Sequence, residues 1–212
     1  MLVSMLRWGA VIVAGGRSSR MGRPKAFLAW RGEPLLRHVV RTALEQCPTV
    51  VVAASPGQPL PWLPAPARRI DDPAERAHRG PVTGVLTGLQ ALAASECDAA
   101  FLTSSDAVES TATHIGFIQA RLEDASPGTE AVVPCSEQDG RRIVHGLSSA
   151  VRIEAALRAL HEMVTGDRWA LKELFENLPT RWLDVDQLPD PAALQAPNTP
   201  EAWEAHRRRH RG

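Results

Sequence analysis

Short runs of apolar residues alternate along the chain with longer segments in which apolar residues recur three and four positions apart. An uninterrupted apolar run is typical of a strand buried on both faces, and the wider spacing is typical of a helix with one buried face. The runs predict strands at residues 9–13, 50–53, 99–103 and 131–134, and further strands are expected at 67–70, 141–147 and 181–185. The wider spacing predicts helices at residues 34–46, 80–94, 111–122, 151–164, 169–178 and 200–209, with Thr199 as the N-cap of the last.

Strands that alternate with helices favour an α/β fold, a Rossmann-like three-layer sandwich with a mostly parallel central sheet. The proline-rich segment 55–66 is expected to be a loop. No repeat or linker divides the sequence, so we expect one domain over residues 1–212 that ends in a frayed basic tail at 206–212. Within that tail, His206 and His210 have the i,i+4 spacing of a metal-binding pair, which is the alternative interpretation.

The segment after the first predicted strand combines adjacent glycines, Gly15 and Gly16, with positive charge. Four cations follow within nine positions: Arg17, Arg20, Arg23 and Lys25. Residues 11–32 contain no Asp or Glu. Adjacent glycines let the backbone approach a ligand closely, and successive N–H groups in such a loop form an anion-binding concavity. The segment is therefore predicted to bind a polyphosphate, with a solvated glycine turn as the alternative.

Two common phosphate-binding loops do not fit this segment. A Walker A loop has Gly directly before its Lys and Ser or Thr after it, but Gly22 lies three positions before Lys25 and Ala26 follows. A dinucleotide-binding loop has the pattern G-x-G-x-x-G, which is absent here.

Two acidic residues come directly after predicted strands, Asp106 after 99–103 and Asp72 after 67–70. Ligands of open α/β sheets bind at the carboxyl ends of strands. Transfer at an α-phosphate needs a divalent ion, and Mg²⁺ is commonly held by one or two carboxylates together with substrate phosphates. Asp106 is the candidate Mg²⁺ ligand, and the alternative is that both residues only stabilise turns.

The sequence of residues 14–25, A-G-G-R-S-S-R-M-G-R-P-K, resembles the signature loop of the nucleotidyltransferases typified by molybdenum cofactor guanylyltransferase. The resemblance implies that the loop wraps the triphosphate of an NTP. The nucleotide-binding residues that it implies are Val13, Ala14, Gly15, Gly16, Arg17 and Lys25. Lys25 and Arg20 would neutralise charge on the bridging and pyrophosphate oxygens.

The same resemblance extends to about residue 203 but is uneven. The family has an Asp a few residues before a helix that starts with G-P-L-A-G. Here Asp72 precedes the sequence G-P-V-T-G that begins at Gly80, and the resemblance assigns Asp72 and Gly80 to nucleotide binding. Asp106 corresponds to the metal-binding Asp of a C-D-x-P-F motif, although the Pro-Phe is absent. Asn198 matches the second Asn of an N-x-N-T-P-E-D motif, on the acceptor side. The base-side Asn after the second strand is missing, because Ala53 follows Val52.

Composition restricts the classes of partner. Lys and Arg together number 24, as do Asp and Glu, so no global field favours nucleic acid or a membrane. No run of about 18 apolar residues is present. Three widely separated cysteines argue against a zinc or disulfide framework and fit a reducing compartment. Arg7 interrupts the apolar N-terminus, which is therefore not interpreted as a signal peptide, and we expect a cytoplasmic protein.

The resemblance implies GTP as donor, molybdopterin phosphate as acceptor, pyrophosphate as leaving group and molybdoenzyme maturation proteins as possible partners. A cytidylyltransferase or another NTP transferase is one alternative, and a non-catalytic nucleotide-binding protein is another. His145 with Ser148 and Ser149 suggests a hydrolase pair by composition only, since no G-x-S-x-G motif is present. Trp30 and Trp62 are expected to be packing residues, with Trp62 as a candidate to lie beside a base or pterin.

Overall fold

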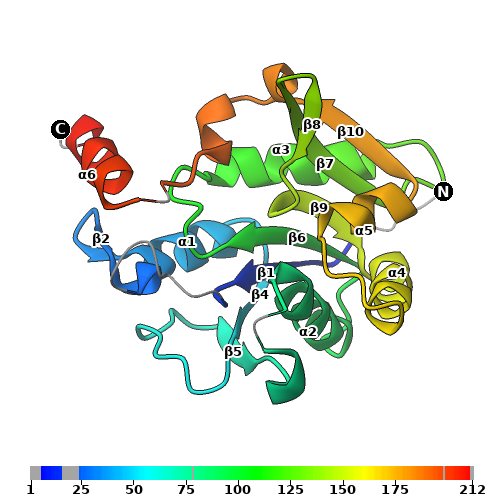
Figure 1. The fold of residues 1–212 in the computed structure, drawn as a ribbon, viewed down its shortest axis with the longest axis horizontal. Helices are drawn as coiled ribbons and strands as arrows, with labels where there is room; N and C mark the ends of the chain where they lie inside the picture. Colours follow the sequence, from blue (N-terminus) through cyan, green and yellow to red (C-terminus); the bar gives the residue numbers. More distant parts are fainter. Residues whose placement is uncertain (1–5, 16–23, 78, 198, 211–212) are drawn as a thin grey trace.

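An eight-stranded sheet runs through the middle of the protein, with helices on both faces (Figure 1). The structure is a computed structural model, and it describes residues 6–15, 24–77, 79–197 and 199–210. The strands are β1 (Trp8–Val13), β2 (Ala29–Trp30), β3 (Glu33–Pro34), β4 (Thr49–Ala54), β5 (Arg68–Asp71), β6 (Ala99–Ser104), β7 (Ala131–Gln138), β8 (Arg141–Val144), β9 (Ser148–Arg152) and β10 (Thr180–Asp184). The α-helices are α1 (Leu35–Leu44), α2 (Pro81–Ala93), α3 (Ala112–Glu123), α4 (Ile153–Thr165), α5 (Lys172–Asn177) and α6 (Pro200–Arg209). Short 3₁₀ helices are η2 (Lys25–Phe27), η3 (Ala74–Arg76), η4 (Val185–Gln187) and η5 (Pro191–Leu194).

The strand order is β10-β7-β9-β6-β1-β4-β5, with β8 paired to β7. The central strand β1 runs parallel to both of its neighbours, so Val11 lies beside Val51 of β4 and Leu102 of β6. On the main path only β9 is reversed, because it pairs antiparallel with β6 and with β7. The predicted mostly parallel α/β sandwich is confirmed.

Alternate residues of the buried strands face two separate apolar layers. Ala10 and Ile12 of β1 belong to the layer that includes the apolar faces of α1 and α3. Val11 and Val13 belong to the layer that includes α2, α4 and α5. Contact between α2 and β1 is close, since a Cβ on Gly88 would lie 2.4 Å from a methyl carbon of Val11. This packing fixes the start of α2 beside the carboxyl end of β1.

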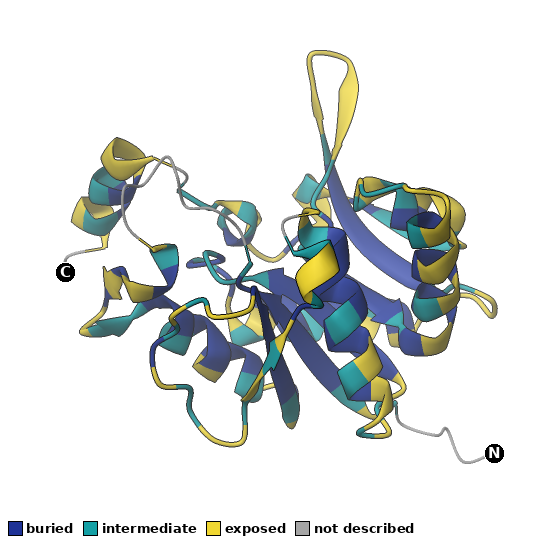
Figure 2. Ribbon diagram, turned by 60° about the horizontal axis from the view of Figure 1, so that its bottom comes forward, coloured by how far each residue is buried: buried dark blue, intermediate teal, exposed yellow. Residues whose placement is uncertain are grey.

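The principal correction to the predicted elements is β9. Residues 151 and 152 were assigned to the start of a helix, but they are the last two residues of this strand, and α4 begins at Ile153. Ala150 and Val151 are fully buried between β6 and β7, and their apolar character continues into the helical spacing of α4. The strand predicted at 131–134 is longer in the structure because it forms a hairpin with β8. The tip of that hairpin is exposed and projects from the molecule (Figure 2).

The C-terminal region also differs from expectation. The Thr199 hydroxyl oxygen accepts a hydrogen bond from the Ala202 N–H at 3.2 Å, which confirms the predicted N-cap. The prediction of a frayed tail from residue 206 is wrong for the residues that the structure describes. Helix α6 continues to Arg209, and His206 is only 2% exposed. Trp203 and His206 share the buried side of the helix and pack near Trp30. None of the helices among the described residues has the length and apolar character needed to cross a membrane.

Candidate functional site

The carboxyl ends of three parallel strands meet where β1 runs into the glycine segment. The Ala14 N–H donates to the carbonyl of Ala53 at 2.8 Å, and the Ser105 N–H donates to the carbonyl of Val13 at 3.0 Å. The turn after β6 and the end of β4 therefore enclose the predicted residues Val13, Ala14 and Gly15. Val13 and Ala14 are both buried, and these two hydrogen bonds fix the path of their backbone.

Lys25 and Asp106 lie in direct contact at this edge of the sheet. Lys25, at the start of η2, donates from Nζ to Oδ2 of Asp106 at 2.6 Å. Ser104, the last residue of β6, donates from its hydroxyl to Oδ1 of Asp106 at 2.6 Å. The Lys25 and Asp106 side chains are only 16% and 18% exposed, so water screens their interaction weakly. The sequence analysis predicts that Lys25 and Asp106 act on the same nucleotide, and the structure has the two side chains in contact.

Asp72 lies on the other side of the glycine segment. It is 7% exposed, and a Cβ on Gly15 would lie 3.5 Å from its Oδ2. Its Oδ1 is buried without a hydrogen-bond partner. Burial raises the pKa of this carboxyl above its usual value. A buried carboxylate oxygen without a donor is costly, so the site is suited to a ligand that brings hydrogen-bond donors.

Gly80 precedes α2 with φ 84° and ψ −170°, a backbone conformation that favours glycine. Pro81 occupies the first turn, as expected for a residue without an N–H group at a helix start. The N-terminus of this 13-residue helix carries the positive end of the helix dipole, which favours anions nearby.

Gln58 is a site residue that the sequence analysis missed. Its side-chain N–H donates to the carbonyl of Ala14 at 2.8 Å, and its Oε1 accepts from the Ser55 N–H at 3.2 Å. The amide thereby ties the loop after β4 to the start of the glycine segment. Nothing in a proline-rich loop singles out this glutamine locally. Four predicted site residues, Gly16, Arg17, Arg20 and Asn198, lie outside the described residues.

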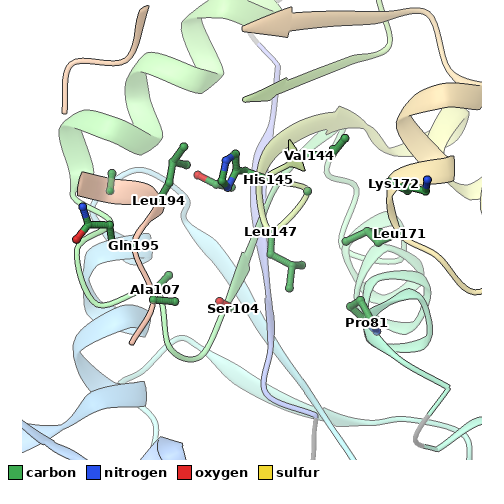
Figure 3. Close-up of a pocket in the computed structure, with 14 residues that line it drawn as sticks. Pro81, Ser104, Ala107, Val144, His145, Leu147, Leu171, Lys172, Leu194 and Gln195 are labelled. Carbon is green, nitrogen blue, oxygen red and sulfur yellow. The ribbon is translucent and has the colours of Figure 1, made fainter. Parts of the chain in front are cut away.

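A pocket of about 340 Å³ opens next to Ser104 (Figure 3). Its polar lining residues come from four separate segments: Ser104, His145 with Ser148, Lys172 and Gln195. Much of the remaining lining is apolar, including Pro81, Leu147 and Leu171. Because Ser104 donates to Asp106, the pocket adjoins the Lys25–Asp106 pair and can hold a second small molecule beside it.

The histidine and serine of the suggested hydrolase pair have different partners. The His145 ring nitrogen Nε2 lies 3.0 Å from the Ser136 hydroxyl, and burial lowers the pKa of His145. The Ser148 hydroxyl lies 2.7 Å from Nε2 of His114, whose pKa burial lowers to about 4. Nδ1 of His114 has no hydrogen-bond partner, so no third group orients the ring as in a catalytic triad. The suggested His145–Ser148 pair is therefore wrong.

The two tryptophans behave differently. Trp30 is 3% exposed and is a packing residue, as predicted. Trp62 is 71% exposed, with the guanidinium carbon of Arg37 at 5.1 Å from its ring centroid, so its assignment to packing is wrong.

The chain is similar to known proteins over most of its length. Residues 10–180 match the family model described as the MobA-like NTP transferase domain. A protein of Mycobacterium tuberculosis named "Probable molybdenum cofactor guanylyltransferase" is 35% identical over 160 residues, 74% of each chain. A protein of the same name from Mycolicibacterium paratuberculosis is 32% identical over 183 residues, 82% of this chain and 84% of the relative.

Solved structures show the same fold at lower sequence identity. The molybdopterin-guanine dinucleotide biosynthesis protein A of Archaeoglobus fulgidus has a TM-score of 0.72 at 16% identity, covering 93% of this chain and 95% of the other. The 2-C-methyl-D-erythritol 4-phosphate cytidylyltransferase of Thermus thermophilus has a TM-score of 0.70 at 17% identity, covering 98% and 100%.

Proposed function

The chain belongs to the MobA-like NTP transferase family, and on that premise we propose that it transfers GMP from GTP to the phosphate of molybdopterin and releases pyrophosphate. The observation that carries the proposal is the Lys25–Asp106 pair at the foot of the glycine segment. A cation in contact with a carboxylate that could bind a metal ion supports the binding of a triphosphate together with its metal ion.

The proposed nucleotide site uses both sides of the β1 end. The Ala14 N–H already donates to the carbonyl of Ala53, so we assign phosphate contact to the backbone N–H groups of Gly15 and Gly16. Lys25 with Arg20 neutralises the charge that develops on the bridging and pyrophosphate oxygens. Arg17 adds positive charge at the same loop. Asp72 supplies an acceptor for donors on the nucleoside, which is supported by its unpartnered Oδ1. Gly80 lets the start of α2 come close to the ligand.

Asp106 fits a hard divalent cation, and we assign Mg²⁺ to it. Its partly exposed carboxylate and the neighbouring Ser104 hydroxyl provide oxygen donors, the type that Mg²⁺ prefers. When bound there, the cation would neutralise phosphate charge and align the reacting groups. We expect Lys25 to move from Asp106 to the phosphates when the nucleotide binds, because the ammonium group and Mg²⁺ would otherwise compete for the same carboxylate.

The acceptor is proposed to occupy the pocket beside Ser104, and Asn198 is assigned to the acceptor through the motif that it matches. Lys172 supplies positive charge and His145 a polar edge for a small anionic molecule. An acceptor phosphate oxygen attacks the α-phosphorus of GTP and forms a new P–O bond. The bond from that phosphorus to the bridging oxygen breaks, and pyrophosphate leaves with the electron pair. The nucleophile is already anionic, so no side chain has to remove a proton.

We also propose that the reaction takes place in the cytoplasm and that proteins which mature molybdoenzymes receive the product. Free Cys47, Cys97 and Cys135 are consistent with a reducing compartment.

The test is pyrophosphate release with GTP, CTP, ATP or UTP, each with Mg²⁺ and molybdopterin, together with identification of the nucleotide product by mass spectrometry. We expect turnover with GTP, dependence on Mg²⁺, and loss of turnover in Asp106→Ala and Lys25→Ala. Arg158→Ala, on the exposed face of α4, is the control and should retain activity. Preference for CTP would identify a cytidylyltransferase. Binding of GTP without pyrophosphate release would favour a non-catalytic nucleotide-binding protein.

A further inference from the structure

Three side chains of types that can bind a metal ion converge at the C-terminal helix. Glu109 lies in the turn after β6, His206 lies on α6, and His210 is the residue that directly follows this helix, four positions after His206. Oε1 of Glu109 is 3.0 Å from Nε2 of His206 and 2.7 Å from Nε2 of His210. One ligand atom from each residue lies within 4.8 Å of the others. Figure 1 shows α6 at the end of the molecule near β2.

His206 gives a second, independent observation. Its side chain is 3% exposed, and although Nε2 lies beside the Glu109 oxygen, the contact does not have hydrogen-bond geometry. The nitrogen is therefore a buried polar atom without a hydrogen-bond partner, aimed at a carboxylate that also faces a second imidazole. An unsatisfied buried nitrogen is unfavourable unless another group binds it. Burial lowers the pKa of His206, and the neighbouring Glu109 carboxylate opposes that shift in part.

Aromatic rings form the wall behind the cluster. The Trp30 ring centroid is 5.0 Å from that of His206 and 5.4 Å from that of His210. Trp203 stacks on His206 at 6.2 Å. These contacts hold the imidazoles in place and exclude water from one side, as is usual around a bound metal ion.

We propose that Glu109, His206 and His210 bind a divalent transition-metal ion, Zn²⁺ being the best match, and that this ion fastens α6 to the turn that carries Asp106. Two imidazoles at i,i+4 with one carboxylate form a common zinc donor set, which leaves a position for water or another ligand. The softer nitrogen donors of this site favour a transition metal, whereas the oxygen donors around Asp106 favour Mg²⁺. Zinc–ligand bonds of about 2.0–2.2 Å place tetrahedral ligands roughly 3.3 Å apart. Small side-chain rotations from the present distances would provide that spacing.

The experiment measures Zn²⁺ and Co²⁺ binding to the full chain, without a tag and without nucleotide, by calorimetry and by the visible absorption of bound Co²⁺. We use an Asp106→Asn background so that the proposed magnesium ligand does not contribute. We expect one ion per chain, and binding weaker by about 100-fold or more in Glu109→Gln and in His210→Ala. His210 is 33% exposed, so its removal leaves the buried packing of His206 in place.

His161→Ala is the matched control, since this histidine lies on the exposed side of α4. It should bind both ions as the background protein does. Zn²⁺ should also raise the melting temperature of the background protein and of this control, but not of the two ligand variants. Equal affinity in all four proteins, or absence of stoichiometric binding in the background protein, would overturn the proposal and leave only the contacts of Glu109 with the two histidines. Neither result bears on the proposed GTP reaction, which is measured separately.

Discussion

Removing either member of the Lys25–Asp106 pair should reveal a strong coupling between them. Their charged atoms are 2.6 Å apart and both side chains are more than four-fifths buried. Coulomb attraction at this distance is about 6 kcal/mol for an effective dielectric constant of 20. Loss of hydration on both groups cancels much of it, and charge-assisted hydrogen bonds contribute about 1.5–3 kcal/mol net. We take that range as the expected coupling free energy.

The measurement is a double-mutant cycle with Lys25→Met, Asp106→Asn and the double variant, using urea unfolding of the ligand-free protein. Each single change should lower the free energy of unfolding, and the double variant should be more stable than the sum of the two losses predicts. The exposed pair Arg158–Glu154 is the control, because its side chains are 62% and 91% exposed. Its coupling should be only about 0.3–0.5 kcal/mol. Losses at Lys25 and Asp106 that add within about 0.5 kcal/mol would refute the reasoning.

The same variants separate the structural role from the proposed catalytic one. Mg²⁺ with GTP should raise the melting temperature of the wild-type protein and of the Arg158→Ala control but not of the two single variants. In the transferase assay, kcat/KM should fall by about 10²–10³ in Lys25→Met, as for other groups that stabilise transition-state charge. Wild-type kinetics in a folded Lys25→Met protein would remove its assigned role.

Three further changes test other parts of the argument. Gly88→Ala should destabilise the protein by about 1–3 kcal/mol in urea unfolding, because its Cβ would meet Val11 at 2.4 Å, whereas Gly84→Ala, with 3.1 Å to its nearest contact, should be close to neutral. Burial lowers the pKa of His114 from 6.5 to about 4, so the stability that depends on its neutral form should be complete above about pH 6.5 and be lost as the pH falls towards 4, by about 3 kcal/mol in total. His114→Gln should remove that part of the pH dependence, measured as the difference between the two unfolding profiles. Asp72→Asn should raise the melting temperature, since burial raises the pKa of this carboxyl and disfavours its charged form at neutral pH, and it should weaken GTP binding in titration calorimetry. Tighter GTP binding would contradict the site assignment.

Sequence patterns predicted most of the sheet because its central strands are short, apolar and buried on both faces. They also predicted the meeting of Lys25 and Asp106, because ligand-binding residues of such sheets follow the carboxyl ends of neighbouring strands. The reversed strand β9 was missed because Ala150 and Val151 lead without interruption into the apolar spacing of α4. No turn residue separates the two elements, so only pairing with β6 and β7 distinguishes them.

Contacts between distant segments account for the remaining errors. The i,i+4 spacing of His206 and His210 was visible in the sequence, but their common partner Glu109 lies far away along the chain. The arginines between them favour solvent, and this composition predicted a frayed tail. Trp203 and His206 nevertheless lie on the one face of α6 that packs against Trp30. Burial of this face decides the position of the helix, and composition alone does not report which face carries the apolar groups.

The two carboxylates beside the end of β1 differ in how far their hydrogen bonds are satisfied. On one side, Asp106 accepts from both Lys25 and Ser104, so the charges satisfy each other before any ligand binds. On the other side, Asp72 retains an unpartnered oxygen at a cost in stability. A ligand with negative charge could take over the contact of Lys25 with Asp106, and a ligand with hydrogen-bond donors could bind the unpartnered oxygen of Asp72. A nucleoside triphosphate has both the negative charge and the hydrogen-bond donors, whereas inorganic pyrophosphate has the charge but lacks the donors. We therefore expect Asp72→Asn to weaken GTP binding more than pyrophosphate binding, and Lys25→Met to weaken both.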